Sequence, residues 1–417
     1  MEKELGVYVH IPFCVSKCAY CDFYSVAGHR ELIPVYHEAL ISHIKESSKQ
    51  LSGYTIDTVY FGGGTPSYYG AQNIVDVFAA LKRYGRVLID SEVTVEVNPE
   101  SVALSDLQLM RKAGINRLSI GVQSANDGTL RSIGRRHNFA QAEETVRNAR
   151  EAGFENVSID LIYGLPSQTR EDWADTLSRG VALKPDHISC YGLKIEKGTP
   201  LYIYKDSPFI PSDDMQADMY LYAVDTLSRA GLYQYEVSNF AKRGMFSRHN
   251  MKYWQGKEYI GFGAAAHSYI GGQRFNYIQD VKKYCENVKN GARLVDQCEN
   301  ITKFEQSMEY LMLGLRTTHG ISEEEYMDIY PCSFEATKKL LDSYIIHGWA
   351  INRDGRWSFT PKGFLVSNAL IGKVLDTQTQ ARTVAAARGE ANFEPAEDQI
   401  SMFAQKSSET TLFHGIS

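Results

Sequence analysis

The stretch Cys14-Val-Ser-Lys-Cys18-Ala-Tyr-Cys21 places three cysteines within eight residues, directly after a segment, Gly6–Phe13, whose pattern is typical of a β-strand. Three thiolates on one short loop can hold three corners of a [4Fe–4S] cubane and leave the fourth iron open to a small molecule. A structural zinc site instead uses four ligands, commonly from two separated pairs, and this sequence has no second pair. The loop therefore predicts a cluster bound by Cys14, Cys18 and Cys21, with zinc as the weaker alternative.

The rest of the composition narrows the class of protein. The other four cysteines, at positions 190, 285, 298 and 332, are isolated from one another, which argues against a disulfide framework. A net charge of −6 provides no basic face for nucleic acid. No apolar run approaches the roughly 20 residues of a membrane-spanning helix, and the first residues lack the apolar core of a signal peptide. We expect a soluble, cytoplasmic protein that binds no nucleic acid.

Short β-rich runs alternate with helical stretches along the first half of the chain. Such alternation predicts parallel strands joined by right-handed crossovers, and thus an α/β fold that is either a partial barrel or a doubly wound sheet. Six strands are expected, at Gly6–Phe13, Asp57–Gly63, Glu92–Asn98, Arg117–Gln123, Asn156–Gly164 and His187–Leu193. Five helices are expected between them, at Pro34–Gln50, Ala71–Tyr84, Ser101–Ala113, Gln141–Ala152 and Arg170–Leu183.

Chemically distinctive residues fall where these strands end. The cysteines follow the first strand, a Gly62-Gly-Gly-Thr-Pro66 run follows the second, and Glu96, Gln123 and Asp160 lie at or near the ends of the next three. Because the carboxyl ends of parallel strands meet at one edge, we expect a single ligand site there.

The alternation stops after residue 193, so residues 1–193 form the expected barrel. Residues 194–300 are rich in Tyr, Gly and Asn, and an irregular cap is expected there. Residues 301–375 predict a small helical unit with a hairpin, Trp349–Phe359, that turns at Asp354-Gly355. Residues 376–417 are polar and are expected to be disordered.

The cysteine spacing followed by Gly62-Gly-Gly-Thr-Pro66 resembles the radical S-adenosylmethionine (SAM) superfamily. Three further stretches resemble the family of oxygen-independent coproporphyrinogen III oxidases and HemW haem chaperones: Tyr8-Val-His-Ile-Pro-Phe-Cys14, Cys21-Asp-Phe-Tyr24 and Asp160-Leu-Ile-Tyr-Gly-Leu-Pro166. The resemblance implies a partial (β/α)6 parallel barrel with an irregular cap and a small C-terminal helical or winged domain. It also implies that SAM chelates the open iron, that an electron from the cluster cleaves its carbon–sulfur bond, and that the resulting 5′-deoxyadenosyl radical abstracts hydrogen.

The same resemblance assigns contacts to SAM. Gly62, Gly63 and Gly64, next to Thr65, are expected to let the methionyl group approach the backbone without a Cβ clash, although a tight turn is the structural alternative. Glu96 is expected to accept from the methionyl amino group, Gln123 and Arg135 to reach its carboxylate or a second nucleotide, and Asp160 to hold ribose hydroxyls. Tyr8 and Tyr20 are expected to shield the cluster.

Two features favour the HemW branch. Oxidases of the family carry a further cysteine two residues after the third, where this sequence has Phe23. The segment His249-Asn250-Met-Lys-Tyr253-Trp254 matches the HNxxYW motif that the resemblance associates with haem. His249 offers an imidazole to iron, and the two aromatic residues offer flat faces to a porphyrin. A packed, hydrogen-bonded histidine is the structural alternative.

The resemblance therefore implies a haem chaperone that delivers haem to acceptor haemoproteins, with the cluster and SAM gating transfer or supporting a homodimer. The alternatives are oxidative decarboxylation of coproporphyrinogen III and a radical enzyme that modifies haem; no catalytic residue is assigned. A flavodoxin- or ferredoxin-type reductant is the implied electron donor. Gln399-Ile-Ser-Met-Phe403 resembles peptides that dock on the bacterial sliding clamp, and an ordinary polar tail is the alternative.

Overall fold

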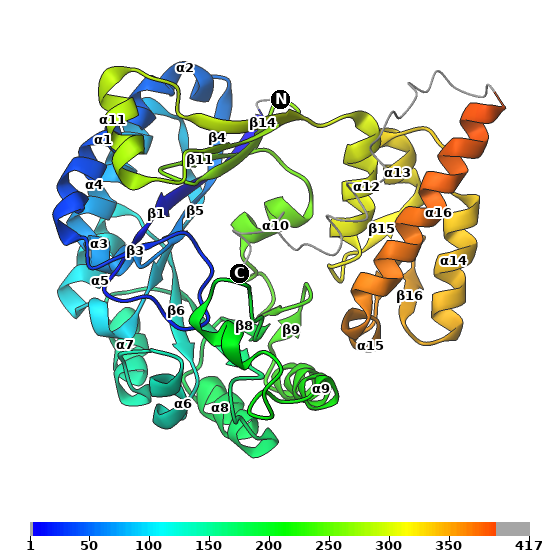
Figure 1. The fold of residues 1–417 in the computed structure, drawn as a ribbon, viewed down its shortest axis with the longest axis horizontal. Coiled ribbons are helices and arrows are strands. Elements are labelled where there is room, and N and C mark those ends of the chain that lie inside the picture. The colour runs from blue at the N-terminus through cyan, green and yellow to red at the C-terminus, as the bar shows by residue number, and fades with distance from the viewer. Residues whose placement is uncertain (1–2, 389–417) are drawn as a thin grey trace. The chain divides into compact units, whose positions relative to one another are not determined.

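The computed structural model describes residues 3–388. They form two compact units (Figure 1). Of the described residues, the first unit comprises 3–233, 238–252 and 257–300, and the second comprises 234–237, 253–256 and 301–388. The short strand β9 (Tyr233–Gln234) and the helix α10 (Arg248–Trp254) lie where the chain passes between the units.

The first unit is built on a curved sheet whose central strands are the six that the sequence predicts. They are β1 (Lys3–Ile11), β4 (Tyr54–Gly63), β5 (Val87–Val97), β6 (Arg117–Gln123), β7 (Asn156–Tyr163) and β8 (His187–Gly192). They are neighbours in that order and all run parallel. The predicted α/β fold is confirmed, and the parallel strands form an open barrel.

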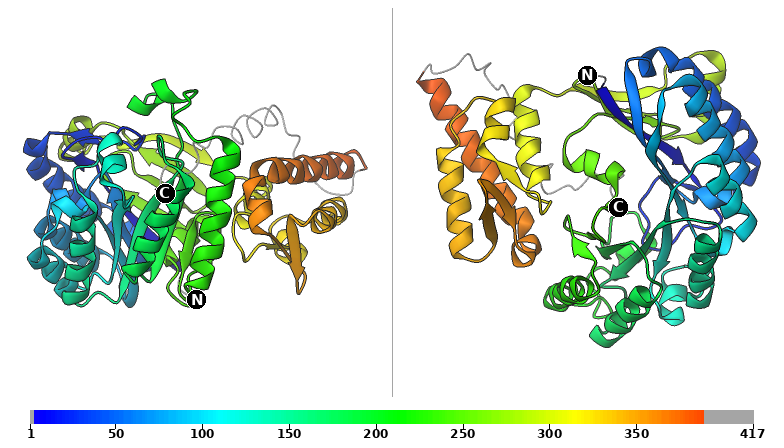
Figure 2. Two further views of the ribbon diagram at one scale, coloured as in Figure 1. Left: turned by 90° about the horizontal axis from the view of Figure 1, so that it is seen from below. Right: turned by 180° about the vertical axis from the view of Figure 1, so that it is seen from behind.

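Helices connect these strands and cover the convex side of the sheet (Figures 1 and 2). They are α1 (Ile33–Glu46), α2 (Ser48–Leu51), α3 (Pro66–Tyr69), α4 (Ala71–Tyr84), α5 (Leu104–Ala113), α6 (Asp127–Ser132), α7 (Phe139–Glu151) and α8 (Arg170–Ala182). The five predicted helices are present within a few residues. Helix α5 begins at Leu104, three residues after the expected start at Ser101, and the backbone N–H of Ala103 donates to the Asp106 carboxylate at 3.0 Å.

Alternation along the strands separates an apolar face from a polar one. In β1, Val7 and Val9 belong to the apolar core under the helices, whereas Tyr8 lies on the opposite, concave face. The polar side chains of the central strands are buried as well. Residues of this kind are Thr58, Glu92, Thr94, Arg117, Ser119, Ser158, His187 and Ser189. The concave face is therefore polar, as a ligand-facing surface requires.

Residues 194–300 are more regular than the predicted irregular cap. Strand β11 (Tyr259–Phe262) pairs in parallel with β1 and adds a seventh parallel strand. Antiparallel strands extend the sheet beyond it: β12 (His267–Ile270), β13 (Gln273–Tyr277) and β14 (Val295–Asn300). Strand β10 (Asn239–Ala241) pairs antiparallel with β8, and α9 (Asp213–Arg229) and α11 (Val281–Asn290) complete the unit. The strands were missed because they are short and pair mostly antiparallel, so no regular strand–helix repeat marks them in the sequence.

The second unit surrounds a three-stranded sheet with helices. The strands are β15 (Ile321–Ser322), β16 (Ala350–Arg353) and β17 (Arg356–Phe359), and the helices are α12 (Lys303–Gly314), α13 (Glu323–Ile329), α14 (Glu335–Ile346), α15 (Pro361–Leu365) and α16 (Ser367–Ala387). The predicted hairpin is confirmed as β16–β17. Its turn residues, Asp354 and Gly355, both have positive φ (52° and 81°), the conformation of a type I′ turn.

Helix α16 corrects the expectation that disorder begins at residue 376. Gln378 is fully buried; its amide oxygen accepts from the Thr337 hydroxyl at 2.7 Å and its amide nitrogen donates to the Ser333 carbonyl at 3.0 Å. Polar composition is compatible with a helix once these groups find partners. The peptide Gln399–Phe403 lies outside the described residues. Within residues 3–388, no helix is both long and apolar enough to cross a bilayer.

Candidate cluster and cofactor site

The cysteine loop is fastened at its base and along its length. Strands β2 (Phe13–Cys14) and β3 (Val26–Ala27) pair at its base. Farther along, the backbone N–H of Ala19 donates to the Ile133 carbonyl at 3.0 Å, and the N–H of Cys21 donates to the Cys18 carbonyl at 3.2 Å. All three cysteines of the motif are partly exposed and form no disulfide, so the well-anchored loop carries three free thiols.

The donor set fits an iron–sulfur cluster. Burial raises the pKa of Cys14 and raises that of Cys21 to about 11, so binding a metal must displace protons from these thiols. Among residues 3–388, no three His, Cys, Asp or Glu side chains are arranged so that they could hold a single metal ion. A cubane takes one soft thiolate at each of three irons, and Cys14, Cys18 and Cys21 supply three such thiolates.

The glycine turn after β4 is packed tightly against its surroundings. A Cβ atom at Gly62 would lie 2.9 Å from Glu96 Oε1, and one at Gly64 would lie 2.7 Å from the Ile11 carbonyl oxygen. Gly63 has φ +110°, and a Cβ there would lie 2.4 Å from the His10 ring. The turn therefore needs glycine to sit against β1, a packing reason that adds to the predicted role in SAM binding.

Glu96 is a buried carboxylate with two defined donors. The Tyr60 hydroxyl donates to Oε1 at 2.8 Å, and the backbone N–H of Gly63 donates to Oε2 at 3.2 Å. Burial raises the pKa of Glu96 to about 7, although the Tyr60 hydrogen bond opposes the shift. A ligand that brings an amino group to this carboxylate would stabilise its charged form.

We expect SAM binding to strengthen between about pH 6 and about pH 8, because the ionised fraction of Glu96 rises from about one tenth to about nine tenths around a pKa near 7. The measurement is the SAM dissociation constant of cluster-reconstituted protein across this range. Glu96→Gln is the control, because it keeps the shape of the side chain and removes the titration. An unchanged pH profile in that variant would assign the dependence to another group.

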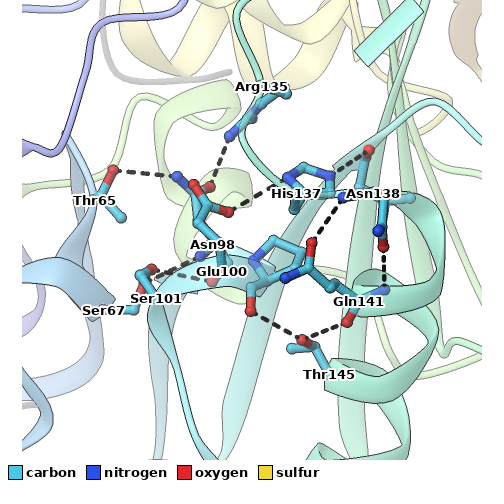
Figure 3. Close-up of polar contacts among 12 residues, drawn as sticks. Thr65, Ser67, Asn98, Glu100, Ser101, Arg135, His137, Asn138, Gln141 and Thr145 are labelled. Atoms are coloured by element: carbon cyan, nitrogen blue, oxygen red, sulfur yellow. Dashed lines mark hydrogen bonds and ion pairs between the residues drawn. The ribbon is translucent and has the colours of Figure 1, made fainter. Parts of the chain in front are cut away.

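Asn98 joins the cysteine loop to the rest of the site. Its amide nitrogen donates to Thr65 Oγ1 at 3.3 Å, and its amide oxygen accepts from Arg135 at 2.8 Å (Figure 3). Thr65 in turn donates to Cys14 Sγ at 3.5 Å, and the Arg135 guanidinium lies 5.9 Å from the centre of the Tyr20 ring. In the sequence, Asn98 is marked only as the last residue of a predicted strand. That position was the only feature from which its linking role could have been predicted.

Gln123 and Arg135 meet above Gly121. A Cβ at Gly121 would lie 2.9 Å from the Gln123 amide nitrogen, 3.0 Å from an Arg135 nitrogen and 3.1 Å from the Asn98 amide oxygen. Gln123 has a positive φ of 64° at a register shift between β6 and β7. This bulge turns its side chain toward the others. Two of the predicted SAM contacts, Gln123 and Arg135, thus lie next to Gly121, a glycine that no sequence motif marks.

Asp160 lies on the neighbouring strand β7, where its carboxylate accepts from the Ser119 hydroxyl at 3.1 Å. Burial raises its pKa. Tyr8, on β1, donates to or accepts from His10 Nδ1 at 3.1 Å, and His10 Nε2 lies 3.0 Å from the Tyr24 carbonyl oxygen of the cysteine loop. The predicted SAM residues are therefore distributed over the concave face and its cysteine-bearing edge.

The HNxxYW residues do not form an exposed group. His249 is only 1% exposed; its Nδ1 lies 2.9 Å from Thr58 Oγ1, and burial lowers its pKa to about 3. Asn250 is half-buried. Tyr253 and Trp254 are buried and belong to the second unit.

Comparisons with known proteins show the family to which the chain belongs. A family model described as the radical SAM superfamily matches residues 8–179. The heme chaperone HemW of Bacillus subtilis is 34% identical over 378 residues, which cover 89% of this chain and 99% of that protein. The Danio rerio protein named radical S-adenosyl methionine domain-containing protein 1, mitochondrial, is 34% identical over 78% of this chain and 75% of its own. Among solved structures, the Escherichia coli coproporphyrinogen III oxidase HemN superposes with a TM-score of 0.79 at 25% identity, covering 90% of this chain and 91% of HemN.

Proposed function

Because the chain belongs to the HemW family of haem chaperones within the radical SAM superfamily, we propose that it binds haem and passes it to acceptor haemoproteins. The observation that carries the proposal is the extent of the match, which takes in 99% of the Bacillus subtilis chaperone and so reaches well past the barrel. Phe23, in place of the additional cysteine of the oxidases, supports the same branch.

The cofactor residues are proposed from the family motifs, and the contacts of the site support them. We assign the [4Fe–4S] cluster to the thiols of Cys14, Cys18 and Cys21. When bound, the cluster and SAM would supply 5′-deoxyadenosyl radical chemistry, in which one electron from the reduced cluster cleaves the carbon–sulfur bond and methionine is released. The Glu96 carboxylate would orient the amino group of SAM, and the Asp160 carboxylate would accept from its ribose hydroxyls. Arg135 and Gln123 donate to the methionyl carboxylate, and Asn98 holds Arg135 in place.

The haem contacts are proposed on the family motif. Asn250, Tyr253 and Trp254 are the proposed contacts to the porphyrin, and His249 the proposed axial ligand. Because His249 is only 1% exposed, ligation requires a rearrangement that makes its imidazole accessible to haem iron. A homodimer and a flavodoxin- or ferredoxin-type reductant are proposed partners.

Oxidative decarboxylation of coproporphyrinogen III is the second candidate, because HemN superposes on nine tenths of the chain with a TM-score of 0.79. A single anaerobic preparation can distinguish the two functions. We expect it to bind haem, to transfer haem to an apo-haemoprotein, and to form neither protoporphyrinogen nor CO₂ from coproporphyrinogen III with SAM and dithionite.

The haem titration is followed by the Soret band, transfer by the spectrum of the acceptor, and decarboxylation by porphyrin chromatography after oxidation. Bovine serum albumin, which binds haem without specific delivery, is the control donor. Turnover of coproporphyrinogen III without haem transfer would overturn the chaperone proposal in favour of the oxidase.

A further inference from the structure

Three aromatic rings lie in sequence on the concave face of the barrel. Tyr8 and Tyr60 are direct partners across β1 and β4, and their rings stack with centroids 6.2 Å apart at 24°. The His249 ring stacks on Tyr60 with a centroid distance of 5.3 Å at 25°. The ring of Tyr60 therefore contacts both a predicted SAM residue and the histidine of the HNxxYW motif.

Several contacts hold the His249 ring against Tyr60. The Nδ1 atom of His249 forms its hydrogen bond with Thr58, two residues before Tyr60 on the same face of β4. The Glu92 carboxylate accepts from the backbone N–H groups of Arg248 at 3.0 Å and His249 at 2.9 Å, which fixes the first turn of α10. On β1, a Cβ at Gly6 would lie 3.4 Å from His249 Cε1. The backbone of β1 therefore also packs close to the His249 ring.

Tyr60 transmits this placement to Glu96. Its hydroxyl is the donor to Glu96 Oε1 at 2.8 Å, while the other carboxylate oxygen is held by the Gly63 backbone. A Cβ at Gly62 would lie 2.9 Å both from Glu96 Oε1 and from Tyr60 Cε1. The side chains of Glu96 and Tyr60 therefore meet over Gly62, where no Cβ separates them. The angle of the Glu96 carboxylate thus depends on where the Tyr60 ring rests, and one face of that ring rests on His249.

We propose that His249 is a positioning residue of the SAM site, which acts by stacking on Tyr60 and so orienting the Glu96 carboxylate. The proposal rests on the proposed function only for the assignment of Glu96 to SAM. It gives the motif histidine a role at the cofactor site that is separate from haem ligation.

The test is SAM binding to cluster-reconstituted protein, measured by equilibrium dialysis. We expect His249→Ala to weaken SAM binding about tenfold, the scale of one stacked aromatic contact and one buried hydrogen bond. Tyr60→Phe, which keeps the ring and removes the hydroxyl, is expected to weaken it by a similar factor. The double variant is expected to be little worse than either single one, because both changes act on the same carboxylate. His249→Gln, which keeps a flat polar group near Thr58, should restore part of the affinity.

His43→Ala is the matched control. His43 is also a buried imidazole that bonds a hydroxyl through Nδ1, at 2.8 Å from Tyr284, and it contacts the Phe262 ring edge-on. It lies on α1, away from the concave face. Equal losses of SAM affinity in His43→Ala and His249→Ala would show a general effect of destabilisation and overturn the proposal.

A haem titration of the same variants separates this proposal from the chaperone function. Weakened SAM binding with retained haem binding in His249→Ala supports positioning and moves the axial ligand elsewhere. Lost haem binding with unchanged SAM affinity would make His249 a haem ligand only and overturn positioning. Failure of the unmodified protein to bind haem would refute the chaperone proposal. The positioning role of His249 would then be decided by the SAM measurements alone.

Discussion

Serine at any one of Cys14, Cys18 or Cys21 is expected to remove the cluster from anaerobically reconstituted protein. The three thiols lie on one loop, and a cubane with two remaining thiolates and a hard hydroxyl has lost a third of its protein ligands. Iron content is expected to fall from about four atoms per chain to well below one, and the EPR signal of the reduced cluster is expected to disappear. SAM binding should fall with it, because the open iron is its expected anchor.

Cys298→Ser and Cys190→Ser are the matched controls for this loss. Cys298 is exposed and Cys190 is buried, and both lie outside the cysteine loop. Both variants are expected to keep the full iron content. A cubane signal of normal intensity in Cys18→Ser, or an equal loss of iron in Cys298→Ser, would refute the three-cysteine site. Circular dichroism of each variant checks that the barrel is intact.

Among glycine-to-alanine substitutions at the site, Gly63→Ala is expected to lower the free energy of unfolding the most. The new Cβ would lie 2.4 Å from the His10 ring, and the backbone φ of +110° is strained for any residue with a Cβ. Overpacking adds about 1–3 kcal/mol to a backbone cost of about 1–2 kcal/mol. We therefore expect a loss of about 3 kcal/mol in the free energy of unfolding, measured by urea denaturation, together with loss of SAM binding.

Gly70→Ala separates the two contributions. Gly70 has nearly the same φ, +109°, but the nearest atom to an added Cβ is 3.8 Å away. This variant should lose only the backbone part, about 1–2 kcal/mol, and should bind SAM normally. If the two alanine variants cost the same, contact with His10 does not limit residue 63, and the packing argument for the glycine turn fails.

Local patterns were enough to predict the core of the fold, and they are also the basis on which the cluster site is proposed. The strand Arg117–Gln123 and the helix Ala71–Tyr84 have the expected bounds. Strand–helix alternation, apolar runs of five or six residues and turn glycines are properties of neighbouring residues. The cysteine spacing is local in the same sense, since one loop carries all three thiols.

The site around the cluster was predicted only in part. Glu96, Gln123, Arg135 and Asp160 were identified by family resemblance, and the structure places Gln123 beside Arg135 over Gly121. The partners that orient them were missed, because Tyr60 and Asn98 look like ordinary strand residues in the sequence. Their roles depend on the register between β4 and β5 and on the bulge in β6.

The sequence by itself determined the parallel α/β core and the trio of thiols, because both are written in residues close together along the chain. Only the tertiary structure decided the seventh parallel strand and the place of His249. Strand β11 joins β1 from some 250 residues away, and His249 bonds to Thr58 across 191 positions. Contacts between residues so far apart in the sequence produce no local periodic pattern. Which residues meet depends on how the strands are arranged in the folded protein.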